Sequence, residues 1–373
     1  MKPSTSAATA AKRKSQKPKP AKEELLTPSH EEAKELCLLA QQIGIAEPWQ
    51  WMEEIDLFGV QDPVAGEIGF VSVMGMRGEY RAIAVYLGEE ALRGWLDFES
   101  ALQLNPELPD AAQLLLEIPH LHVSFSPPDQ LEKRDRDLLK GVGLKFTGVR
   151  PLFRSSRPGY FPWFITREEA RLMIQILSQT INVAGRFLEN PDILSLERDD
   201  NDLGLLVRVP HEKGSELIWE DKIQKLPLRR PELTSGAIEP AVLNKLKQIT
   251  QSHLEAELDL LMGPAAVGKR SERPLAVFTL LLGDHQSRLI CGVESMTAEQ
   301  GLEAMYTGIP NQVARVLSEA QLLPKRLRIR SDKLLTLLKP LARELNIELF
   351  HTTELPAIEE AVDFMFEQMG TNP

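Results

Sequence analysis

The chain has few of the features that commit a protein to the cell exterior or to a membrane. Its 373 residues include two cysteines, Cys37 and Cys291, and both lie within segments of apolar periodicity. Two distant cysteines build no disulfide framework, so they predict reduced, buried thiols in a cytoplasmic protein. No run of residues approaches the roughly twenty apolar positions of a membrane helix. No apolar run follows the first basic residues, which argues against a secretory signal.

Motifs for nucleotide binding and for nucleophilic catalysis are also missing. The glycines between Gly59 and Gly88 do not fall between a strand and a helix, as a dinucleotide fingerprint requires. Residues 263–270 (GPAAVGKR) resemble a phosphate-binding loop superficially, but they follow a predicted helix and end in Arg where a hydroxyl is needed. No Gly-x-Ser-x-Gly elbow occurs. We therefore expect no cofactor.

Charge is distributed unevenly along the chain. Seven basic residues and no acidic residue occur among the first 22 positions, whereas the whole chain has a formal net charge of −11. A segment rich in Lys, Pro, Ser and Ala is typical of a disordered, solubilising tail. Contact with nucleic acid or an anionic membrane, and an organelle transit peptide, are the alternative interpretations. Because the body is acidic, we expect a protein partner in preference to nucleic acid, and no membrane.

The pattern along the chain predicts four regions. Residues 1–28 form the basic tail, residues 29–225 an α+β domain, residues 226–271 a linker with an amphipathic helix, and residues 272–373 a C-terminal α/β domain. In the first domain, apolar periodicity and turn residues predict helices and strands in mixed order. The expected helices are 29–44, 89–104, 129–140 and 166–190, and the expected strands are 69–75, 80–88, 119–125, 144–154, 203–209 and 216–220.

The C-terminal part has a more regular pattern. Residues 240–262 are predicted to form the amphipathic helix, and residues 263–274 a flexible linker. Strands 275–282 and 288–294, helices 297–306 and 310–321, strand 326–330, helix 332–344, strand 347–350 and helix 355–369 are expected to follow. This order of elements resembles a reduced ribonuclease H-like fold.

Two parts of the chain resemble bacterial families of unknown function. Residues 30–225 resemble the first family through Glu47–Glu54 (EPWQWMEE), the Gly59–Gly88 hairpin and Arg154–Trp163 (RSSRPGYFPW). The resemblance implies a bacterial protein with this domain at its N-terminus, and it supplies no catalytic residue.

The second resemblance covers residues 272–370. It depends on Arg328–Lys333 (RIRSDK) and Leu345–Pro356 (LNIELFHTTELP). These segments are similar to a small domain that is common in uncharacterised cyanobacterial and other bacterial proteins. This family also implies architecture and supplies no catalytic residue.

The strongest candidate binding segment joins a strand to a helix at residues 150–170. Residues 150–163 contain three arginines and four aromatic residues, and they precede a helix that Thr166 and Glu169 begin as a capping box. Arginines can grip an anionic ligand while aromatic rings stack on it. In the interpretation that we favour, Pro162 and Trp163 fold under the helix as a hydrophobic staple and the arginines cover the aromatic residues. The candidate partner-binding residues are Arg150, Arg154, Arg157, Tyr160 and Trp163.

The C-terminal domain offers a candidate catalytic site. Active ribonuclease H-like enzymes hold two divalent cations between several carboxylates, and the candidates here are Asp284, Glu303, Asp332 and Asp363. The predicted first strand, residues 275–282, carries no acid, and Asp332 also suits a helix N-terminus. We therefore favour a non-catalytic interaction or regulatory module, with a metal-dependent phosphodiesterase or nuclease as the alternative.

Two further patterns favour structural roles. Arg326, Arg328 and Arg330 alternate along a predicted strand, which is typical of a solvated face paired with Glu or Asp of neighbouring helices, and a phosphate-binding ridge is the alternative. His120 and His122 share one face of another strand, but no Cys or acid accompanies them at metal-ligand spacing. We interpret them as a polar sheet face, and we expect no bound metal.

Overall fold

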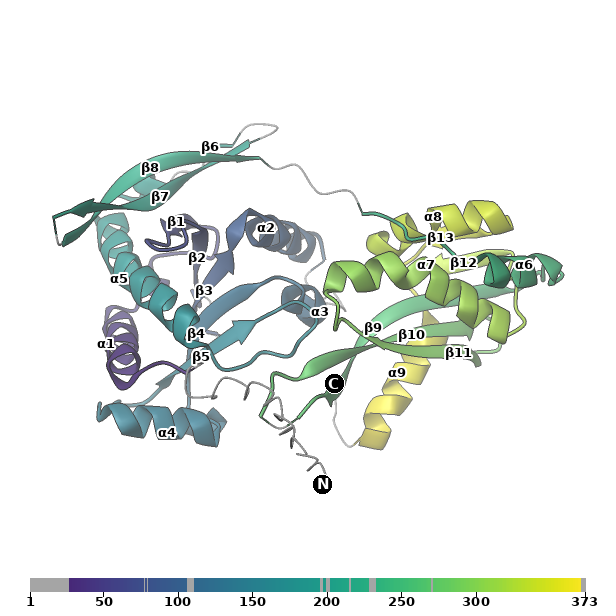
Figure 1. Cartoon of the computed structure of the whole chain (residues 1–373), viewed down its shortest axis with the longest axis horizontal. Helices are drawn as coiled ribbons and strands as arrows, with labels where there is room; N and C mark the ends of the chain where they lie inside the picture. The colour runs from purple at the N-terminus through teal and green to yellow at the C-terminus, as the bar shows by residue number, and fades with distance from the viewer. Residues whose placement is uncertain are drawn as a thin grey trace, which may run out of the picture.

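A computed structural model describes residues 27–76, 78, 80–105, 111–194, 197–198, 202–214, 216–227, 233–269 and 271–369. They form two units, each a sheet with helices packed on it, that lie side by side (Figure 1). This mixture of helices and sheets in two regions confirms the expected α+β class. The predicted tail up to residue 26, Arg77 in the first hairpin turn and residues 228–232 of the connector lie outside the described residues.

The N-terminal unit is built on an eight-stranded sheet in the order β5-β4-β3-β2-β1-β7-β6, with β8 paired to β7. Its neighbouring strands are antiparallel except for β1 and β7, which are parallel. The two predicted hairpins are confirmed as β2–β3 and β7–β8. The strands are β1 (Phe58–Gln61), β2 (Ile68–Met74), β3 (Ala82–Leu87), β4 (His120–Ser126), β5 (Arg150–Ser156), β6 (Glu197–Arg198), β7 (Asp202–Lys213) and β8 (Glu216–Pro227).

Helices cover both faces of this sheet. The apolar sides of α1 (His30–Ala46), α4 (Lys133–Val142) and α5 (Arg167–Glu189) join one core, and that of α2 (Gly88–Leu104) joins the core on the opposite face. Short turns of helix complete the unit: α3 (Ala111–Leu116), η2 (Pro48–Gln50), η3 (Pro128–Gln130) and η4 (Pro191–Leu194).

The starts of α1 and α5 follow directly from sequence. Ser29 with Glu32 and Thr166 with Glu169 form the two capping boxes that their spacing predicts, so each helix has its first backbone N–H groups satisfied. The expected end of α1 at Gly44 is wrong by a short distance, because Glu47 adopts a left-handed conformation, with φ of 50°, and supplies the C-cap instead.

The C-terminal unit has a five-stranded sheet in the order β11-β10-β9-β12-β13. β10 is antiparallel to β9 and β11, whereas β9, β12 and β13 are parallel. Helices α6, α7 and α8 cover one face and α9 packs on the other. The elements are α6 (Pro240–Gln248), β9 (Glu255–Val267), β10 (Leu275–Asp284), β11 (Ile290–Thr297), α7 (Leu302–Glu319), β12 (Arg326–Ile329), α8 (Asp332–Leu345), β13 (Glu348–His351) and α9 (Pro356–Met369).

The structure corrects the predicted helix over residues 240–262. Helix α6 ends at Gln248, and residues 255–267 form β9, the central strand of the second sheet. The apolar residues Leu254, Leu258 and Leu261 fit a helical spacing, but Ala256, Leu258 and Leu260 also alternate with the acids of the segment, which is the period of a strand. Pairing with two neighbouring strands decides between the two patterns. Residues 263–267 of the expected flexible linker also belong to β9.

The two helices expected at 297–306 and 310–321 are also wrong, because they are one helix, α7. Pro310 lies inside it and is buried in the core. A proline within a helix costs one backbone hydrogen bond, and burial of the flanking Ile309 and Val313 offsets that cost. Among the described residues, none of the helices combines the length and the apolar character that crossing a membrane requires.

The two units touch through α3 and the loop after β5. The Gln113 side chain on α3 accepts from the backbone N–H of Met262 at 2.8 Å and donates to the carbonyl of Leu260 at 3.4 Å, as a neighbouring strand would. Glu117 accepts hydrogen bonds from the Tyr306 hydroxyl and from Lys333 Nζ. These contacts position the loop that carries the candidate binding residues against the second sheet.

Candidate binding site at the domain junction

The loop between β5 and α5 pairs with both sheets. Ser155 and Trp163 exchange backbone hydrogen bonds of 2.8 and 2.9 Å, which extends the edge of the first sheet. On the other side, Tyr160 bridges Leu275 at the start of β10, and the N–H of Phe161 donates to the carbonyl of Pro274 at 3.0 Å. This loop, residues 157–166, which we call the Arg/aromatic loop, therefore connects the two units.

Gly159 and Arg273 tighten this joint. Gly159 has φ of +83°, and a Cβ at this position would lie 2.5 Å from Cβ of Ala298, so the close approach of the two units requires glycine. Arg273 donates to the carbonyl and the hydroxyl of Ser155. Burial, together with the positive charge of Arg157, lowers the pKa of Arg273 to about 10.

Arg154 is held within the N-terminal unit. Its guanidinium pairs with both carboxylate oxygens of Asp135, each at 2.8 Å, and also reaches Glu132 at 3.2 Å. The side chains of Arg154 and Asp135 are 10% and 9% exposed, so the pair is almost entirely shielded from water. The guanidinium carbon also lies 4.6 Å from the ring centre of Phe164. These contacts engage the strong donors of Arg154 inside the protein.

The other predicted binding residues occupy different positions along the joint. Arg157 is exposed and pairs with Glu169 at 3.0 Å, whereas Arg150 donates to backbone carbonyls next to itself. The ring of Trp163 packs edge-on against Phe164, with 5.1 Å between ring centres. Trp163 and Arg154 therefore both contact Phe164, while Arg150 lies at the other end of β5 from this loop. Their part in partner binding stays a prediction.

A groove of about 690 Å³ opens between the units beside this loop. One wall comes from the start of α4 and from Trp163 and Phe164, and the other from the strand ends around residues 266–274. Its charged lining comprises the cations Lys133, Arg134 and Lys269 and the acids Glu132, Asp137 and Glu272. The groove combines exposed aromatic area with charged groups, which is the composition of a recognition site.

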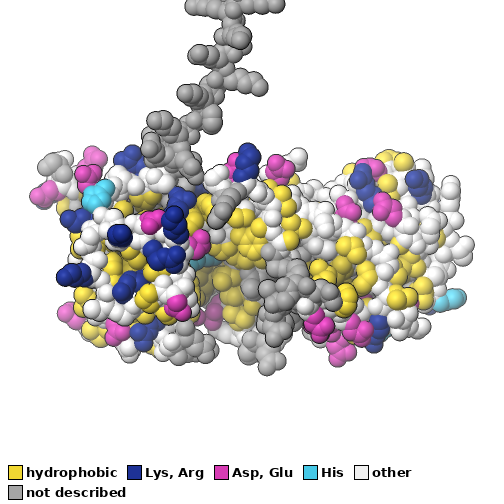
Figure 2. All heavy atoms as spheres, turned by 90° about the horizontal axis from the view of Figure 1, so that it is seen from below, with side chains coloured by type: hydrophobic (Ala, Val, Ile, Leu, Met, Phe, Trp, Pro, Cys, Tyr) yellow, Lys and Arg dark blue, Asp and Glu magenta, His cyan; other side chains and the backbone are white. Residues whose placement is uncertain are grey.

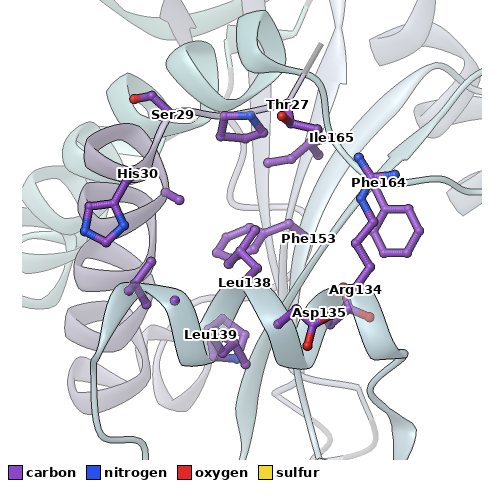
Figure 3. Close-up of a pocket in the computed structure, with 16 residues that line it drawn as sticks. Thr27, Ser29, His30, Arg134, Asp135, Leu138, Leu139, Phe153, Phe164 and Ile165 are labelled. Carbon is purple, nitrogen blue, oxygen red and sulfur yellow. The ribbon is translucent and has the colours of Figure 1, made fainter. Parts of the chain in front are cut away.

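A second cavity of about 330 Å³ lies on the other side of Phe164, within the N-terminal unit. Leu138, Leu139 and Phe153 point into it from α4 and β5, and the chain before α1 crosses its rim (Figure 3). Arg134 lines both spaces, with its guanidinium carbon 4.4 Å from the ring centre of Phe164. Phe164 therefore separates an apolar cavity from a more polar groove.

The second sheet contains carboxylates that sequence reasoning missed. Glu257 and Asp259 project from β9 and are 0% and 1% exposed. Glu257 accepts from the backbone N–H groups of Ala357 and Ile358 at the start of α9, at 2.8 and 3.2 Å. Its other oxygen lies 2.5 Å from Nδ1 of His285. The alternation of acids at 255, 257 and 259 was the available signal, and the predicted helix concealed it.

Arginines of β12 neutralise the remaining acids of this face. Arg326 and Arg328 both pair with Glu255, at 2.7 and 3.1 Å, and Arg330 lies 3.4 Å from Asp259. The arginines pair with acids, as expected, but the expected helical partners are wrong for Glu255 and Asp259, which belong to strand β9. Arg330 also lies 3.7 Å from Glu359 of helix α9. Each carboxylate of β9 is therefore already balanced by a cation or by helix N–H groups.

The four proposed catalytic acids are spread over the C-terminal unit. Glu303 is on α7 and Asp363 on α9, so they lie on opposite faces of the sheet. The side chain of Asp332 is 90% exposed, with His351 at 3.9 Å, while Ser331 caps α8. Asp284 accepts from the Ser287 hydroxyl at 2.6 Å, which lowers its pKa. Across the part of the chain that the structure describes, no three acidic, His or Cys side chains are grouped to hold a metal.

His120 and His122 lie in a more enclosed environment than a solvated sheet face. His120 is 6% exposed and its Nδ1 lies 2.8 Å from the carbonyl of Ile118. The two rings stack with 5.6 Å between centres. Burial, with the charges of His120 and Arg154, lowers the pKa of His122 to about 3. The face is polar, as expected, but packed.

These features describe a two-domain α+β protein with a groove at the domain junction. Residues 34–208 match a family described as a domain of unknown function (DUF7309), and residues 242–366 match a second domain of unknown function (DUF6930). The two matches confirm the resemblance of both parts to families of unknown function. No curated protein and no solved structure matches the chain.

Proposed function

We propose that the protein is a non-catalytic, two-domain interaction module that binds its partner in the groove at the domain junction. The observation that carries this proposal is the position of Trp163 and Phe164. Both rings are half-buried and line the groove, although the loop that bears them is fixed by backbone hydrogen bonds to both units. A binding surface benefits from aromatic groups that are held rigidly, because little conformational entropy is then lost on binding.

The arginines contribute to this proposal in two ways. Arg154 and Arg273 shape the groove from within, because they hold Phe164 and the Ser155 backbone in place. Arg157 remains exposed near the joint and Arg134 lines the groove itself. We therefore assign partner contact to Trp163, Phe164 and Arg134, and a supporting role to Arg154.

Co-purification with a matched control tests this function. The full chain, its Trp163→Ala variant and its Phe364→Ala variant are each expressed with a tag, and each extract is divided and treated with or without nuclease. Phe364 is 61% exposed on α9, so it is an exposed aromatic residue outside the groove. We expect a partner that is retained by the wild type and by Phe364→Ala but lost by Trp163→Ala. A partner retained equally by all three proteins would contradict the proposal.

For the C-terminal unit we propose a ribonuclease H-like fold that begins before β9. The support is the sheet order, in which a central strand, β9, has an antiparallel hairpin on one side and two parallel strands on the other. With this starting point, residues 29–225 remain the proposed N-terminal domain. We also propose a cytoplasmic location, because neither Cys37 nor Cys291 pairs with the other. Cys37 is fully buried, whereas Cys291 is exposed, so the expected burial of Cys291 is wrong.

The alternative function, a metal-dependent phosphodiesterase, receives one favourable observation, namely acids on the central strand of this sheet. The pairing of those acids weighs against it. A divalent cation at Glu257 or Asp259 has to displace helix N–H groups, His285 or Arg330 from their present contacts. Cleavage of oligonucleotides that depends on Mn²⁺ and is lost in Asp259→Asn would favour the enzyme over the interaction module.

A further inference from the structure

A group of basic residues lies on α4 and the segment that follows it, and two of them, Lys133 and Arg134, line the groove. We call it the α4 basic surface, and it comprises Lys133, Arg134, Arg136, Lys140, Lys145 and Arg150. Arg150 is half-buried and the other five residues are exposed. Lys and Arg side chains gather on this half of the molecule when it is seen from below, where α4 lies (Figure 2).

The cations of this surface lack acidic partners. None of the six makes an ion pair with a residue that the structure describes. Arg136 and Arg150 donate to backbone carbonyls instead. Of the acids in and directly before α4, Asp135 and Glu132 pair with Arg154, whereas Asp137 lines the groove beside the cations. By contrast, the arginines of β12 are each paired with an acid.

Unpaired cations that are close together create a positive local potential even on an acidic protein. Here that potential lies next to the aromatic wall of the groove. Lys133 and Arg134 line the groove together with Trp163 and Phe164. On the second unit Lys269 is paired with Glu272 at 3.2 Å, so the unpaired cations of the groove are those of the N-terminal unit. Lys and Arg side chains bind phosphates, and aromatic rings stack on unstacked bases.

A basic segment precedes the described residues in the sequence. The first 22 residues contain seven basic residues and no acid. The described chain begins at Thr27, which lines the apolar cavity together with Arg134 and Asp137.

We propose that the partner of the groove is single-stranded nucleic acid. Its phosphates lie along the α4 basic surface and its bases stack on Trp163, while Phe164, which carries Arg134 and Arg154 over its ring, supports Trp163 from behind. This inference rests on the proposed function, since it names the partner class of the same groove. A membrane fits less well, because the two rings line a concave groove that a flat bilayer does not enter. An acidic protein satisfies the cations but offers no flat bases for the rings.

Equilibrium binding of a fluorescent oligouridylate to the full chain tests this proposal. For single strands the logarithm of affinity falls with the logarithm of salt concentration, with a slope of about −0.7 for each phosphate bound. We compare Lys133→Glu/Arg134→Glu/Lys145→Glu with Lys245→Glu/Lys339→Glu/Arg343→Glu, which changes three exposed cations of the C-terminal unit. The first variant is expected to reduce the slope by about 2 and the affinity by at least about tenfold. The second variant is expected to change little.

Trp163→Ala separates stacking from charge. It is expected to weaken binding about tenfold and leave the salt slope unchanged, because loss of a ring removes base stacking and no phosphate contact. Polyglutamate and phosphatidylserine vesicles serve as competitors with the same sign of charge. The proposal predicts that neither displaces the oligouridylate at equal charge concentration.

Three results overturn the proposal: no binding of oligouridylate, equal slopes for the two triple variants, or displacement by polyglutamate or vesicles as readily as by unlabelled oligouridylate. Equal slopes mean that the N-terminal segment alone holds the phosphates. If oligouridylate fails but Trp163→Ala still loses a co-purified partner, the partner class is wrong and the interaction module stands. If both readouts fail, the groove is not the binding site.

Discussion

The guanidinium of Arg154 and the carboxylate of Asp135 form a two-point pair in which both nitrogen–oxygen distances are 2.8 Å. The pair connects β5 to the start of α4, and Phe164 packs against its outer side. It therefore fixes the ring that divides the groove from the apolar cavity. Arg154, which the sequence analysis placed at the partner surface, is instead paired with Asp135 inside the N-terminal unit.

Loss of Arg154 is expected to destabilise the fold. Arg154→Ala leaves the carboxylate of Asp135 buried without a cation, which costs about 3–5 kcal/mol of unfolding free energy. Arg157→Ala is the matched control, because its pair with Glu169 is 54% exposed on the arginine side and is worth less than about 1 kcal/mol. Urea unfolding measures both. Unchanged stability in Arg154→Ala would return this residue to the list of partner contacts.

Gly159→Ala is expected to loosen the joint between the two units. The new methyl group meets Cβ of Ala298 at 2.5 Å and also disfavours the φ of +83°. Gly148→Ala isolates the second effect, because Gly148 has φ of +70° with no heavy atom within 4 Å of the new carbon. The difference between the two variants in thermal stability reports the contact between the units. Restoration by Gly159→Ala/Ala298→Gly supports this explanation, and equal losses in the two single variants contradict it.

Glu117 and Lys333 are expected to be coupled energetically across the domain junction. Their side chains are 10% and 30% exposed, and Lys333 Nζ also lies 4.2 Å from the ring centre of Tyr306. A double-mutant cycle with Glu117→Gln and Lys333→Met is expected to give a coupling of about 1–3 kcal/mol. The same cycle on Lys247 and Glu344, which are both about half exposed, is expected to give less than about 1 kcal/mol. Equal couplings would show that the junction does not shield its ion pair.

Local signals in the sequence predict much of the fold. Ser29 with Glu32 and Thr166 with Glu169 identify two helix starts, because a capping box needs only four consecutive residues. The β2–β3 hairpin also follows from short-range alternation and turn residues. Strand β9 was missed because its apolar residues fit both periods, and the choice is made by pairing with β10 and β12, which is not local.

The residue types of the candidate site could be predicted from the sequence, but the residues that they contact could not. The sequence places Arg154, Trp163 and their neighbours in one segment, and the structure brings that segment to the domain junction. What a guanidinium contacts depends on residues far away in the chain. Arg273, for example, donates to Ser155, which lies 118 positions before it. Whether an arginine faces solvent or an acid is therefore decided by tertiary packing, beyond what spacing within a motif indicates.

The stability of the N-terminal unit is expected to fall in mild acid because of His122. It stacks on His120 and lies opposite Arg154 in the sheet, and its pKa is lowered from 6.5 to about 3. The unfolded chain therefore binds a proton below pH 6.5 that the folded protein does not. The contribution of His122 to stability is complete above pH 6.5 and decreases as the pH falls towards 3, by at most about 1.4 kcal/mol for each pH unit.

Urea unfolding between pH 7 and pH 4 measures this loss. His122→Gln removes the titrating ring and keeps a polar side chain, so the variant is expected to lose less stability than the wild type over the same range. His253→Gln, at an exposed position, is expected to follow the wild type. The pKa of His120 is also lowered by burial, so His120→Gln is expected to reduce the slope in the same direction. Parallel loss of stability in the wild type and His122→Gln would assign the acid sensitivity to other groups.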